Sequence, residues 1–464
     1  MIRKHKSILF LLFVYAIIAA LTIIFFNGTG GEGDSVTHYL FAKYAPAHPE
    51  LFFDHWAKPV FVLLSSPFAQ FGFSGIKVFN VLITILTIFF TYRTAGLLNL
   101  KNKILSALFS IFSPLYFILT FSGLTEPLFA LFTILGVYLA LKQRFIAAAV
   151  IISFLPFVRS EGLIIAGVFG FYFLLKKKWN LLPLLLTGHI VYSIAGYFVY
   201  HDLLWVFTKI PYNNLGSPYG SGELFHFVNE LLYVTGVPLY ALFWTGFVFI
   251  IYKFFKKEIS SEVGVLVFLG FIAFFVAHSL FWYLGIFNSM GLKRVLIGVI
   301  PLISLIALYG FNFVYEILIR NLLFKKIAGT VILLYVFIFP FTHNPAAINW
   351  EKDMELSNKQ QFAKEVAKAI INKKGNDNRY AFSYTYFSLI FNIDYFDKEK
   401  RVELTNEYLN QIRENDIIIW DDWFSKYQRR ISLVSLDKNP ELQKFLLIKS
   451  PDNKEVVFST FIGK

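Results

Sequence analysis

Residues 8–42 read ILFLLFVYAIIAALTIIFFNGTGGEGDSVTHYLFA, and they join an apolar run to a segment of glycines, acids and a histidine. The apolar run, residues 8–26, carries no charge and is long enough to cross about 30 Å of hydrocarbon as a helix. No small-x-small cleavage site follows it, which predicts a retained membrane helix rather than a removed signal. Acids and histidines beside a bilayer are costly, so Asp34 and His38 require a partner or a function.

The composition extends this reading to most of the chain. Hydrophobic residues make up 56% of the 464 residues and the mean hydropathy is +0.59, whereas soluble proteins are about 45–50% apolar. We therefore predict an all-α polytopic membrane protein with about eleven transmembrane helices. The predicted spans are 8–26, 76–92, 104–121, 127–141, 145–157, 162–175, 181–200, 231–252, 262–284, 295–317 and 327–341.

The basic residues set the expected orientation. The net charge of +13 arises mostly before residue 350, and basic residues concentrate in alternate loops, as cytoplasmic loops do. These loops hold Arg3, Lys4, Lys6, Arg93, Lys101, Lys103, Lys142, Arg144, Lys176, Lys177, Lys178, Lys253, Lys256, Lys257, Arg320, Lys325 and Lys326. We expect a cytoplasmic N-terminus and no nucleic-acid partner. The abundance of Phe, Ile, Lys and Asn suggests a bacterial inner (plasma) membrane.

Two segments are expected on the outer side of the membrane. The first is a loop over residues 27–75, in which the short apolar stretch 59–73 predicts an interfacial or re-entrant helix. The second is residues 342–464, a small soluble α/β domain. A serine-capped helix over 357–376, strands at RYAFSY and DIIIWDDWF, a helix at LTNEYLNQIREN, and a closing strand pair at KFLLIKS and EVVFSTF are expected there. Residues 1–341 form the expected transmembrane domain.

Several ionisable residues fall at the predicted outer ends of different spans, which indicates one shared cavity on that side. They are Asp34, His38, Glu126, Arg159, Glu161, His278, Lys293 and Arg294.

Each of these residues also has a purely structural explanation. A lone Arg or Lys can extend its side chain to the lipid headgroups. Glu126 can be a helix N-terminal acid, Arg159 and Glu161 a structural pair, and His278 an interhelical hydrogen-bond donor. Elsewhere, Asp421 and Asp422 resemble a metal-binding pair, but a strand end entering a turn explains them better.

Asp34 has the strongest functional signal. It follows Gly28, Gly30, Gly31 and Gly33, whose missing side chains permit the close approach of a ligand. It begins a segment in which positions 34 and 38 share one helical face. An N-cap role is compatible with a catalytic one.

Four short motifs resemble one family of membrane enzymes. GEGDSVTHYLFA (31–42), SGLTEPLFALF (122–132), PFVRSEGLIIAG (156–167) and GLKRVLIGVIPLISLIALYG (291–310) resemble the lipid-phosphate-sugar-dependent glycosyltransferases of the GT-C superfamily. That group includes protein O-mannosyltransferases, aminoarabinose transferases that modify lipid A, and lipid-linked mannosyltransferases. The long first outer loop and the outward soluble tail match the same layout.

The resemblance implies roles for the residues. An acid in the first outer loop is the general base of such enzymes, and Asp34 occupies that place. Ser35 stands where many relatives have a second acid, so a metal role is not supported, and we assign no metal ligand and no cofactor. Arg294, Lys293 and Arg159 correspond to the residues that hold the donor phosphate.

The expected reaction is an inverting transfer of a monosaccharide, with mannose as a candidate, from a polyprenyl-phosphate donor to an acceptor hydroxyl on the outer (periplasmic) face. It needs a base for the acceptor proton and cations for the departing phosphate. His38, Glu126, Glu161 and His278 are candidate substrate-binding residues. The acceptor can be a glycan, a lipid or a protein. A lipid-linked glycan polymerase or ligase remains an alternative, and a transporter or flippase is less favoured because no internal repeat is visible.

Overall fold

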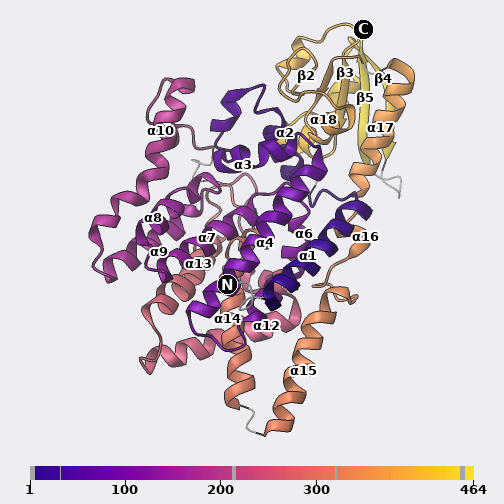
Figure 1. Cartoon of the computed structure of the whole chain (residues 1–464). Coiled ribbons are helices and arrows are strands. Elements are labelled where there is room, and N and C mark those ends of the chain that lie inside the picture. Colours follow the sequence, from indigo (N-terminus) through magenta and orange to yellow (C-terminus); the bar gives the residue numbers. More distant parts are fainter. Residues whose placement is uncertain (1–5, 32, 212–215, 319–320, 376, 450–454) are drawn as a thin grey trace.

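The structure is a computed structural model, and it describes residues 6–31, 33–211, 216–318, 321–375, 377–449 and 455–464. Three of the cations in the predicted inner loops lie outside the described part, namely Arg3, Lys4 and Arg320. A bundle of apolar helices forms most of the chain, and a smaller unit of strands and helices follows it (Figure 1). The chain is therefore a polytopic helical membrane protein with a C-terminal α/β unit.

Among the described residues, seven helices are long and apolar enough to cross a membrane. They are Lys6–Phe25, Phe73–Leu97, Trp179–Tyr200, His226–Phe255, Glu262–Leu284, Lys293–Glu316 and Leu322–Phe341. They contain α1 (Lys6–Phe25), α4 (Phe73–Leu97), α10 (Thr187–Tyr200), α12 (His226–Phe255), α13 (Gly270–Leu284), α14 (Ile300–Asn312) and α15 (Leu322–Ile338). Each overlaps a span predicted from the sequence.

The remaining predicted spans are shorter helices. They are α7 (Glu126–Leu141), α8 with its following turn (Phe145–Phe157) and α9 (Gly162–Leu175), and the segment predicted at 59–73 forms α3 (Pro59–Ala69). The prediction of one unbroken helix over 104–121 is wrong. This segment forms two helices, α5 (Ile104–Ile111) and α6 (Pro114–Thr120), because Pro114 has no backbone N–H and the residue before a proline disfavours helical geometry. Ser113 is accordingly extended, with φ −74° and ψ 112°.

Two of the predicted inner loops meet at one end of the bundle. Lys101 lies 3.2 Å from the Glu316 carboxylate and Lys325 lies 3.0 Å from it, which joins the α4–α5 connection to the α14–α15 connection. The loop predicted as the first outer loop, with α2 (Asp34–Tyr44) and α3, lies at the opposite end (Figure 1). These two predicted inner loops therefore lie at the other end of the bundle from the predicted first outer loop.

The C-terminal unit contains one five-stranded sheet of order β2-β1-β3-β5-β4. Its strands are β1 (Tyr380–Phe382), β2 (Arg401–Val402), β3 (Ile417–Asp421), β4 (Leu442–Lys449) and β5 (Val456–Gly463). β1 pairs in parallel with β2 and β3, while β5 is antiparallel to β3 and β4. The predicted strands at RYAFSY and DIIIWDDWF and the predicted closing pair are confirmed.

Helix α17 (Asn358–Lys374) begins as the sequence predicts. Ser357 accepts from the Gln360 backbone N–H, and the Gln360 side chain accepts from the Ser357 backbone N–H, which is a complete capping box. The helix expected over LTNEYLNQIREN, in contrast, is only a 3-10 turn at Tyr408–Asn410. There the Thr405 hydroxyl accepts from the Tyr408 N–H and the Tyr408 hydroxyl donates to Asp416 at 2.7 Å, and these side-chain bonds replace helical ones.

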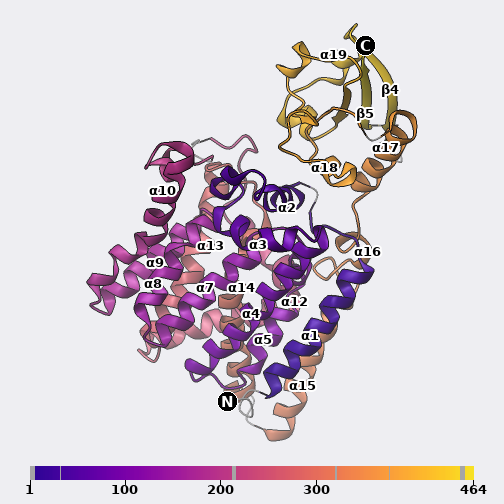
Figure 2. The same cartoon turned by 45° about the horizontal axis from the view of Figure 1, so that its top comes forward.

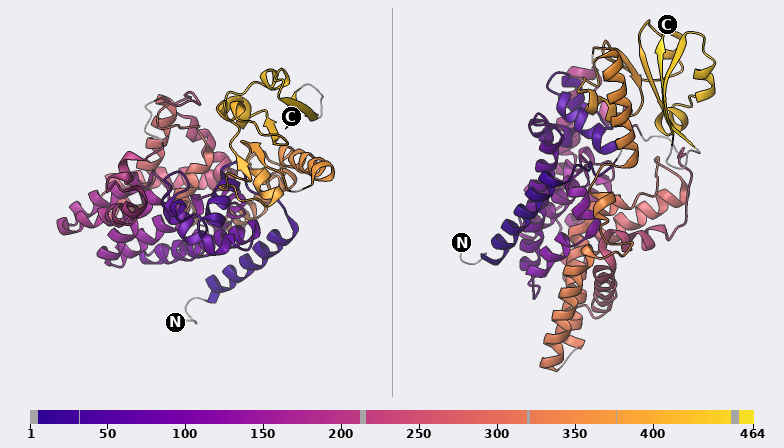
Figure 3. Two further views of the ribbon diagram at one scale, coloured as in Figure 1. Left: turned by 90° about the horizontal axis from the view of Figure 1, so that it is seen from above. Right: turned by 90° about the vertical axis from the view of Figure 1, so that its right-hand side faces the viewer.

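The core of the C-terminal unit continues into the first outer loop. Val36, Tyr39 and Leu40 of α2 are buried in the same hydrophobic cluster as Val366 of α17 and Phe387. Phe387 belongs to α18 (Tyr386–Phe391), which packs on α2. Figures 2 and 3 show the strands beyond the end of the bundle that carries α2. The helix that begins with Asp34 therefore contacts the bundle on one side and the sheet unit on another.

Candidate active site

The centre of the candidate site is an ion pair between two distant parts of the chain. Asp34 is the first residue of α2, and Arg294 lies in the 3-10 segment η7 (Lys293–Val299) that leads into α14. The Arg294 Nη2 atom donates a hydrogen bond to the Asp34 carboxylate. The Asp34 side chain is 46% exposed, so its free carboxylate edge is accessible. Asp34 is thus held by Arg294 and is at the same time accessible from outside the protein.

This pairing controls the protonation of Asp34. Burial by itself would raise the pKa of the Asp34 carboxyl, but the charge and hydrogen bond of Arg294 lower the pKa below its usual value of 3.8. Asp34 is consequently ionised at neutral pH. An ionised carboxylate is the form that can accept a proton.

Glu126 lies behind this pair and connects it to a second arginine. It is the first residue of α7 and is fully buried. Its Oε1 atom lies 2.8 Å from Arg159 Nη1 and 3.4 Å from Arg294 Nε. A buried carboxylate requires such partners. Glu126 therefore acts as the shared counter-ion of the two guanidinium groups, which explains an acid at this position more specifically than a helix-dipole effect.

Arg159 is held from several directions. Its Nε and Nη2 atoms donate to Glu161 Oε1 at 3.1 and 2.8 Å, and its Nη1 atom donates to the Thr125 hydroxyl at 3.1 Å. His278 Nε2 lies 3.9 Å from the same Glu161 oxygen. Burial raises the pKa of Glu161, but Arg159 and the neighbouring groups outweigh it and hold the pKa at about 2. Glu161 is therefore a permanent anion beside Arg159.

His38 is placed one turn after Asp34 on α2, as the sequence predicts. Its ring stacks on Trp56, with centroids 4.8 Å apart and an interplanar angle of 17°. Burial lowers the pKa of His38 to about 3, so the imidazole is neutral. Within the described part of the chain, neither His38 Nδ1 nor His278 Nε2 has a hydrogen-bond partner. These two nitrogens are therefore buried polar atoms without a partner among the described residues.

Lys58 is a residue of the site that the sequence motifs did not predict. Lys58 precedes Pro59 at the start of α3, is 7% exposed and has a left-handed φ of 69°. Its Nζ atom donates to Ser160 Oγ at 3.1 Å, between Arg159 and Glu161 in sequence. Burial lowers the pKa of Lys58 to about 8. A lysine before a proline, in the same loop as Asp34, was the available signal.

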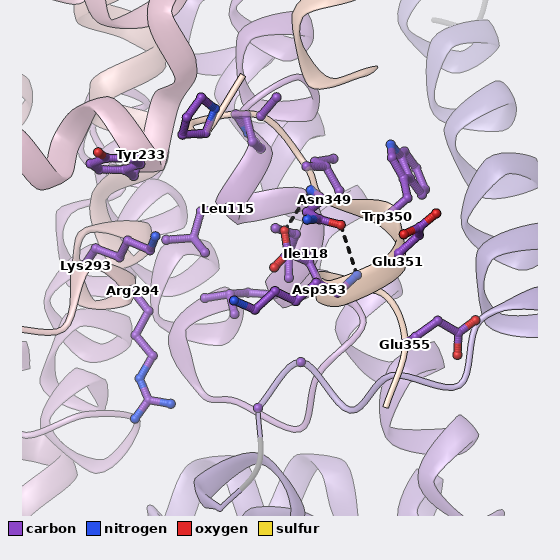
Figure 4. A pocket seen from close by; sticks show the side chains of 18 of the residues that line it. Leu115, Ile118, Tyr233, Lys293, Arg294, Asn349, Trp350, Glu351, Asp353 and Glu355 are labelled. Carbon is purple, nitrogen blue, oxygen red and sulfur yellow. Dashed lines mark hydrogen bonds between the residues drawn. The ribbon is translucent and has the colours of Figure 1, made fainter. Parts of the chain in front are cut away.

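Lys293 and Arg294 differ from the other predicted site residues because they line a cavity. The Lys293 Nζ atom lies 5.0 Å from the centroid of the Tyr233 ring. The cavity has a volume of about 860 Å³, and Lys293 and Arg294 lie in its wall (Figure 4). Leu115, Ile118 and Leu119 of α6 supply an apolar wall. Residues 341–353 close another side with mixed polar and apolar groups.

The glycines before Asp34 let the loop approach its own neighbours closely. Gly30 has φ +66°, and a Cβ atom there would lie 2.4 Å from Ser122 Cβ. A Cβ atom on Gly33 would lie 3.0 Å from the ring of Phe424, which belongs to the C-terminal unit. From the sequence, these glycines were predicted to permit the close approach of a ligand. Packing against the protein accounts for these two positions, and Gly30 and Gly31 also line the cavity.

The Asp421–Asp422 pair is a structural turn, as the sequence analysis favoured. Asp421 accepts hydrogen bonds from the backbone N–H groups of Trp423, Phe424 and Ser425 at 2.7–3.1 Å. Lys359 Nζ lies 3.1 Å from the Asp421 carboxylate. Over the described residues, no three histidine or carboxylate side chains gather in a way that could hold a metal ion.

Comparisons with known proteins identify the fold. No protein-family model matches the sequence, and no curated protein matches it. Among solved structures, ArnT from Cupriavidus metallidurans bound to undecaprenyl phosphate has a TM-score of 0.64 and 11% identity, over 98% of each chain. Its apo form gives a TM-score of 0.63 at 10% identity. The apo oligosaccharyltransferase of Archaeoglobus fulgidus gives a TM-score of 0.51 at 11% identity, over 88% of this chain and 69% of that one.

The chain has the fold of these ArnT and oligosaccharyltransferase structures, and the family resemblance drawn from the sequence motifs is thus confirmed at the level of the fold. The chain is an integral membrane protein with this architecture over nearly its full length. At these identities the likeness shows the fold, and the chemistry must be argued from the site itself.

Proposed function

We propose that this protein is an inverting membrane glycosyltransferase that moves a monosaccharide from a polyprenyl-phosphate donor to an acceptor hydroxyl. The observation that carries the proposal is the contact of Asp34 with Arg294, a residue that lines the 860 Å³ cavity. This contact supports the assignment of Asp34 as the base beside a phosphate-binding cation. The fold shared with an ArnT structure that holds undecaprenyl phosphate supports the same donor class. Mannose remains the candidate sugar.

The cavity suits an amphiphilic donor. Lys293 and Arg294 offer two cations for a phosphate, while Leu115, Ile118 and Leu119 offer an apolar surface for the first isoprene units. Arginine binds phosphate through a planar pair of N–H donors. The arginine and the apolar wall lie in one cavity, so one ligand with an anionic head and a hydrocarbon tail can use both.

Arg294 links donor binding to the activation of Asp34. In the structure its guanidinium is shared between Asp34 and Glu126. A donor phosphate that binds Arg294 competes with Asp34 for these N–H groups and partly neutralises the arginine. The pKa of Asp34 then rises from its lowered value, and a carboxylate with a higher pKa is a stronger base. Binding of the donor thus prepares the base.

The reaction needs little else from the protein. The acceptor oxygen attacks the anomeric carbon, Asp34 takes the hydroxyl proton, and the bond from that carbon to the phosphate oxygen breaks. Arg294 and Lys293 stabilise the charge that develops on the departing polyprenyl phosphate. A single displacement inverts the anomeric configuration.

The buried network supports these residues and contributes polar groups to the substrate. Glu126 fixes Arg294 by its Nε atom, and Arg159 fixes Glu126 in turn. We assign Arg159 and Lys58 a long-range electrostatic effect on the phosphate, because Glu161 and Ser160 already engage their side chains. We assign His38 and His278 contacts with sugar hydroxyls through their unpartnered ring nitrogens.

A lipid-linked glycan ligase is the second candidate, because the archaeal oligosaccharyltransferase shares the fold. Its donor would carry a diphosphate instead of a monophosphate. The two candidates therefore differ in the anion that the cavity prefers.

Thermal unfolding of the purified protein with added lipids tests the proposal. Undecaprenyl phosphate should raise the unfolding temperature, and undecaprenol of the same chain length should not, because the cations recognise the phosphate. A larger shift with undecaprenyl diphosphate would favour the ligase. Equal shifts with the phosphate and the neutral alcohol would contradict a phosphate site.

A further inference from the structure

The C-terminal unit contacts the loop and the helix turn that carry Asp34. Gly28 N–H donates to the Met354 carbonyl at 2.8 Å, and Gln360 Nε2 donates to the Thr29 hydroxyl at 2.8 Å. Gln360 is 2% exposed, so this bond is shielded from water. The glycine-rich loop is therefore attached to the start of the C-terminal unit on one side.

A second contact reaches the first turn of α2. The Thr37 hydroxyl lies 3.0 Å from the Gly33 carbonyl, to which it donates, and 3.0 Å from the Thr385 hydroxyl. A hydroxyl has one proton, so Thr37 shares its proton between two acceptors, the Gly33 carbonyl and the Thr385 hydroxyl. Thr385 is 7% exposed. This short chain of bonds connects the sheet unit to the carbonyl of the residue that precedes Asp34.

A third contact is made by an aromatic ring. Phe424 lies against Gly33, where a Cβ atom would come within 3.0 Å of the ring. The turn that presents Phe424 is fixed by Asp421, which is fully buried and accepts the Phe424 N–H at 2.7 Å. Lys359 Nζ, 3.1 Å from Asp421 and 5.5 Å from the Phe424 ring centroid, fixes the same turn from α17. Asp421 thus fixes the turn that holds the Phe424 ring against Gly33.

We infer that Thr385 and Phe424 are positioning residues for the transfer reaction, and that the C-terminal unit is the back wall of the active site. They touch no substrate atom in this scheme. They fix the entry of the chain into α2 and so the direction of the Asp34 carboxylate toward Arg294. The inference rests on the proposed function, and it assigns the unit a role in the chemical step in addition to any role in recognising acceptors.

The expected loss of kcat follows from the displacement of the reacting group. A displacement of about 1 Å at a reacting group can reduce the rate about 100-fold. Removing the Phe424 ring leaves space beside Gly33 into which the first turn of α2 can move. We expect Phe424→Ala to lower kcat by about 10-fold to 100-fold. The KM for the donor should change little, because Lys293 and Arg294 lie on a different element.

The experiment compares matched pairs in the full-length protein. Trp423→Ala is the control for Phe424→Ala, because Trp423 is the adjacent aromatic residue and is 45% exposed. Thr385→Ser keeps the hydroxyl and should retain the wild-type kcat, whereas Thr385→Val keeps the shape, loses the hydroxyl that accepts from Thr37 and should lower kcat. Equal kcat values for Phe424→Ala and Trp423→Ala, together with equal values for Thr385→Val and Thr385→Ser, would overturn the inference.

Hydrogen–deuterium exchange separates this inference from the proposed function. Backbone amides of residues 33–38 should exchange faster in Phe424→Ala and Thr385→Val than in Trp423→Ala and Thr385→Ser, whatever reaction the protein catalyses. If wild-type protein shows no sugar transfer but this exchange pattern appears, the proposed function fails and the contact is real. Unchanged exchange at 33–38 in both variants would refute the positioning role. If Phe424→Ala does not fold, the Thr385 pair decides the question.

Discussion

The Arg294 guanidinium donates to the Asp34 carboxylate from a position 260 residues further along the chain, and its Nε atom also lies 3.4 Å from Glu126. One cation thus contacts both an accessible acid and a buried one. The buried contact fixes the arginine, and the accessible contact can be exchanged for a ligand. This relationship gives the site a direct means to couple anion binding to the state of Asp34.

The first prediction concerns donor affinity. Arg294→Ala should weaken binding of undecaprenyl phosphate by about 1.5–3 kcal/mol, the scale of a hydrogen bond to a charged group. Arg294→Lys should recover part of this, because lysine lacks the planar fork. Titration of the purified protein with the lipid measures both. Lys209→Ala removes an exposed cation away from the cavity and serves as the control. Equal affinity in all variants would place the phosphate elsewhere.

The second prediction concerns stability. Glu126→Gln removes the buried charge shared by Arg159 and Arg294 and leaves both cations without it. Loss of one partner from a buried pair typically costs about 3–5 kcal/mol. Denaturant unfolding in detergent should show a loss near that range. Glu258→Gln, at a 56% exposed acid that pairs with Lys253 at 3.6 Å, should change stability by less than about 1 kcal/mol. Similar small losses in both variants would argue against the shared counter-ion.

The third prediction is the pH dependence of transfer. While Arg294 pairs with Asp34, the pKa of Asp34 lies below 3.8, so the base stays ionised to low pH. The acidic limb of kcat/KM reports the free enzyme and should therefore lie below pH 3.8 in wild type. In Arg294→Ala, burial still raises the pKa and the opposing charge is gone, so the limb should move to higher pH. A limb that stays in place would separate Asp34 from the rate.

The fourth prediction is the orientation in the membrane. The concentration of basic residues in alternate loops places the N-terminus in the cytoplasm and residues 342–464 outside. Reporter fusions at Lys177 and Lys464 should therefore report opposite sides of the membrane. Two fusions on the same side would contradict this topology.

Much of the site could be predicted from the sequence because charge near a bilayer is costly. Asp34, Glu126, the Arg159–Glu161 turn and Arg294 belong to four separate parts of the chain, yet each charge needs a counter-ion, and one shared cluster satisfies them all. That these charged residues lie together follows from the assignment of their loops to one side of the membrane. The prediction did not depend on how the helices pack.

Other features depended on contacts that no local pattern reveals. The apolar face of α2, with Val36, Tyr39 and Leu40, has the composition of a helix that lies on a membrane surface, but it packs in the core of the C-terminal unit. The break at Pro114 lies inside an apolar run long enough to suggest one span. Lys58 gave only a weak signal, because a loop lysine near a membrane usually contacts headgroups.

The most direct test of the account is the rate of sugar transfer by Asp34→Asn. Asparagine keeps the shape of the side chain and can occupy the start of a helix nearly as well as aspartate, but it cannot accept the proton. Donor binding should persist, because the cations are intact and a nearby negative charge is gone. Loss of a general base typically costs about 10²–10⁴-fold in rate. We therefore expect release of polyprenyl phosphate from a polyprenyl-phosphate mannose donor, with membrane extract as acceptor, to fall by about that factor at matched protein levels. Transfer by Asp34→Asn at the wild-type rate would contradict the central claim.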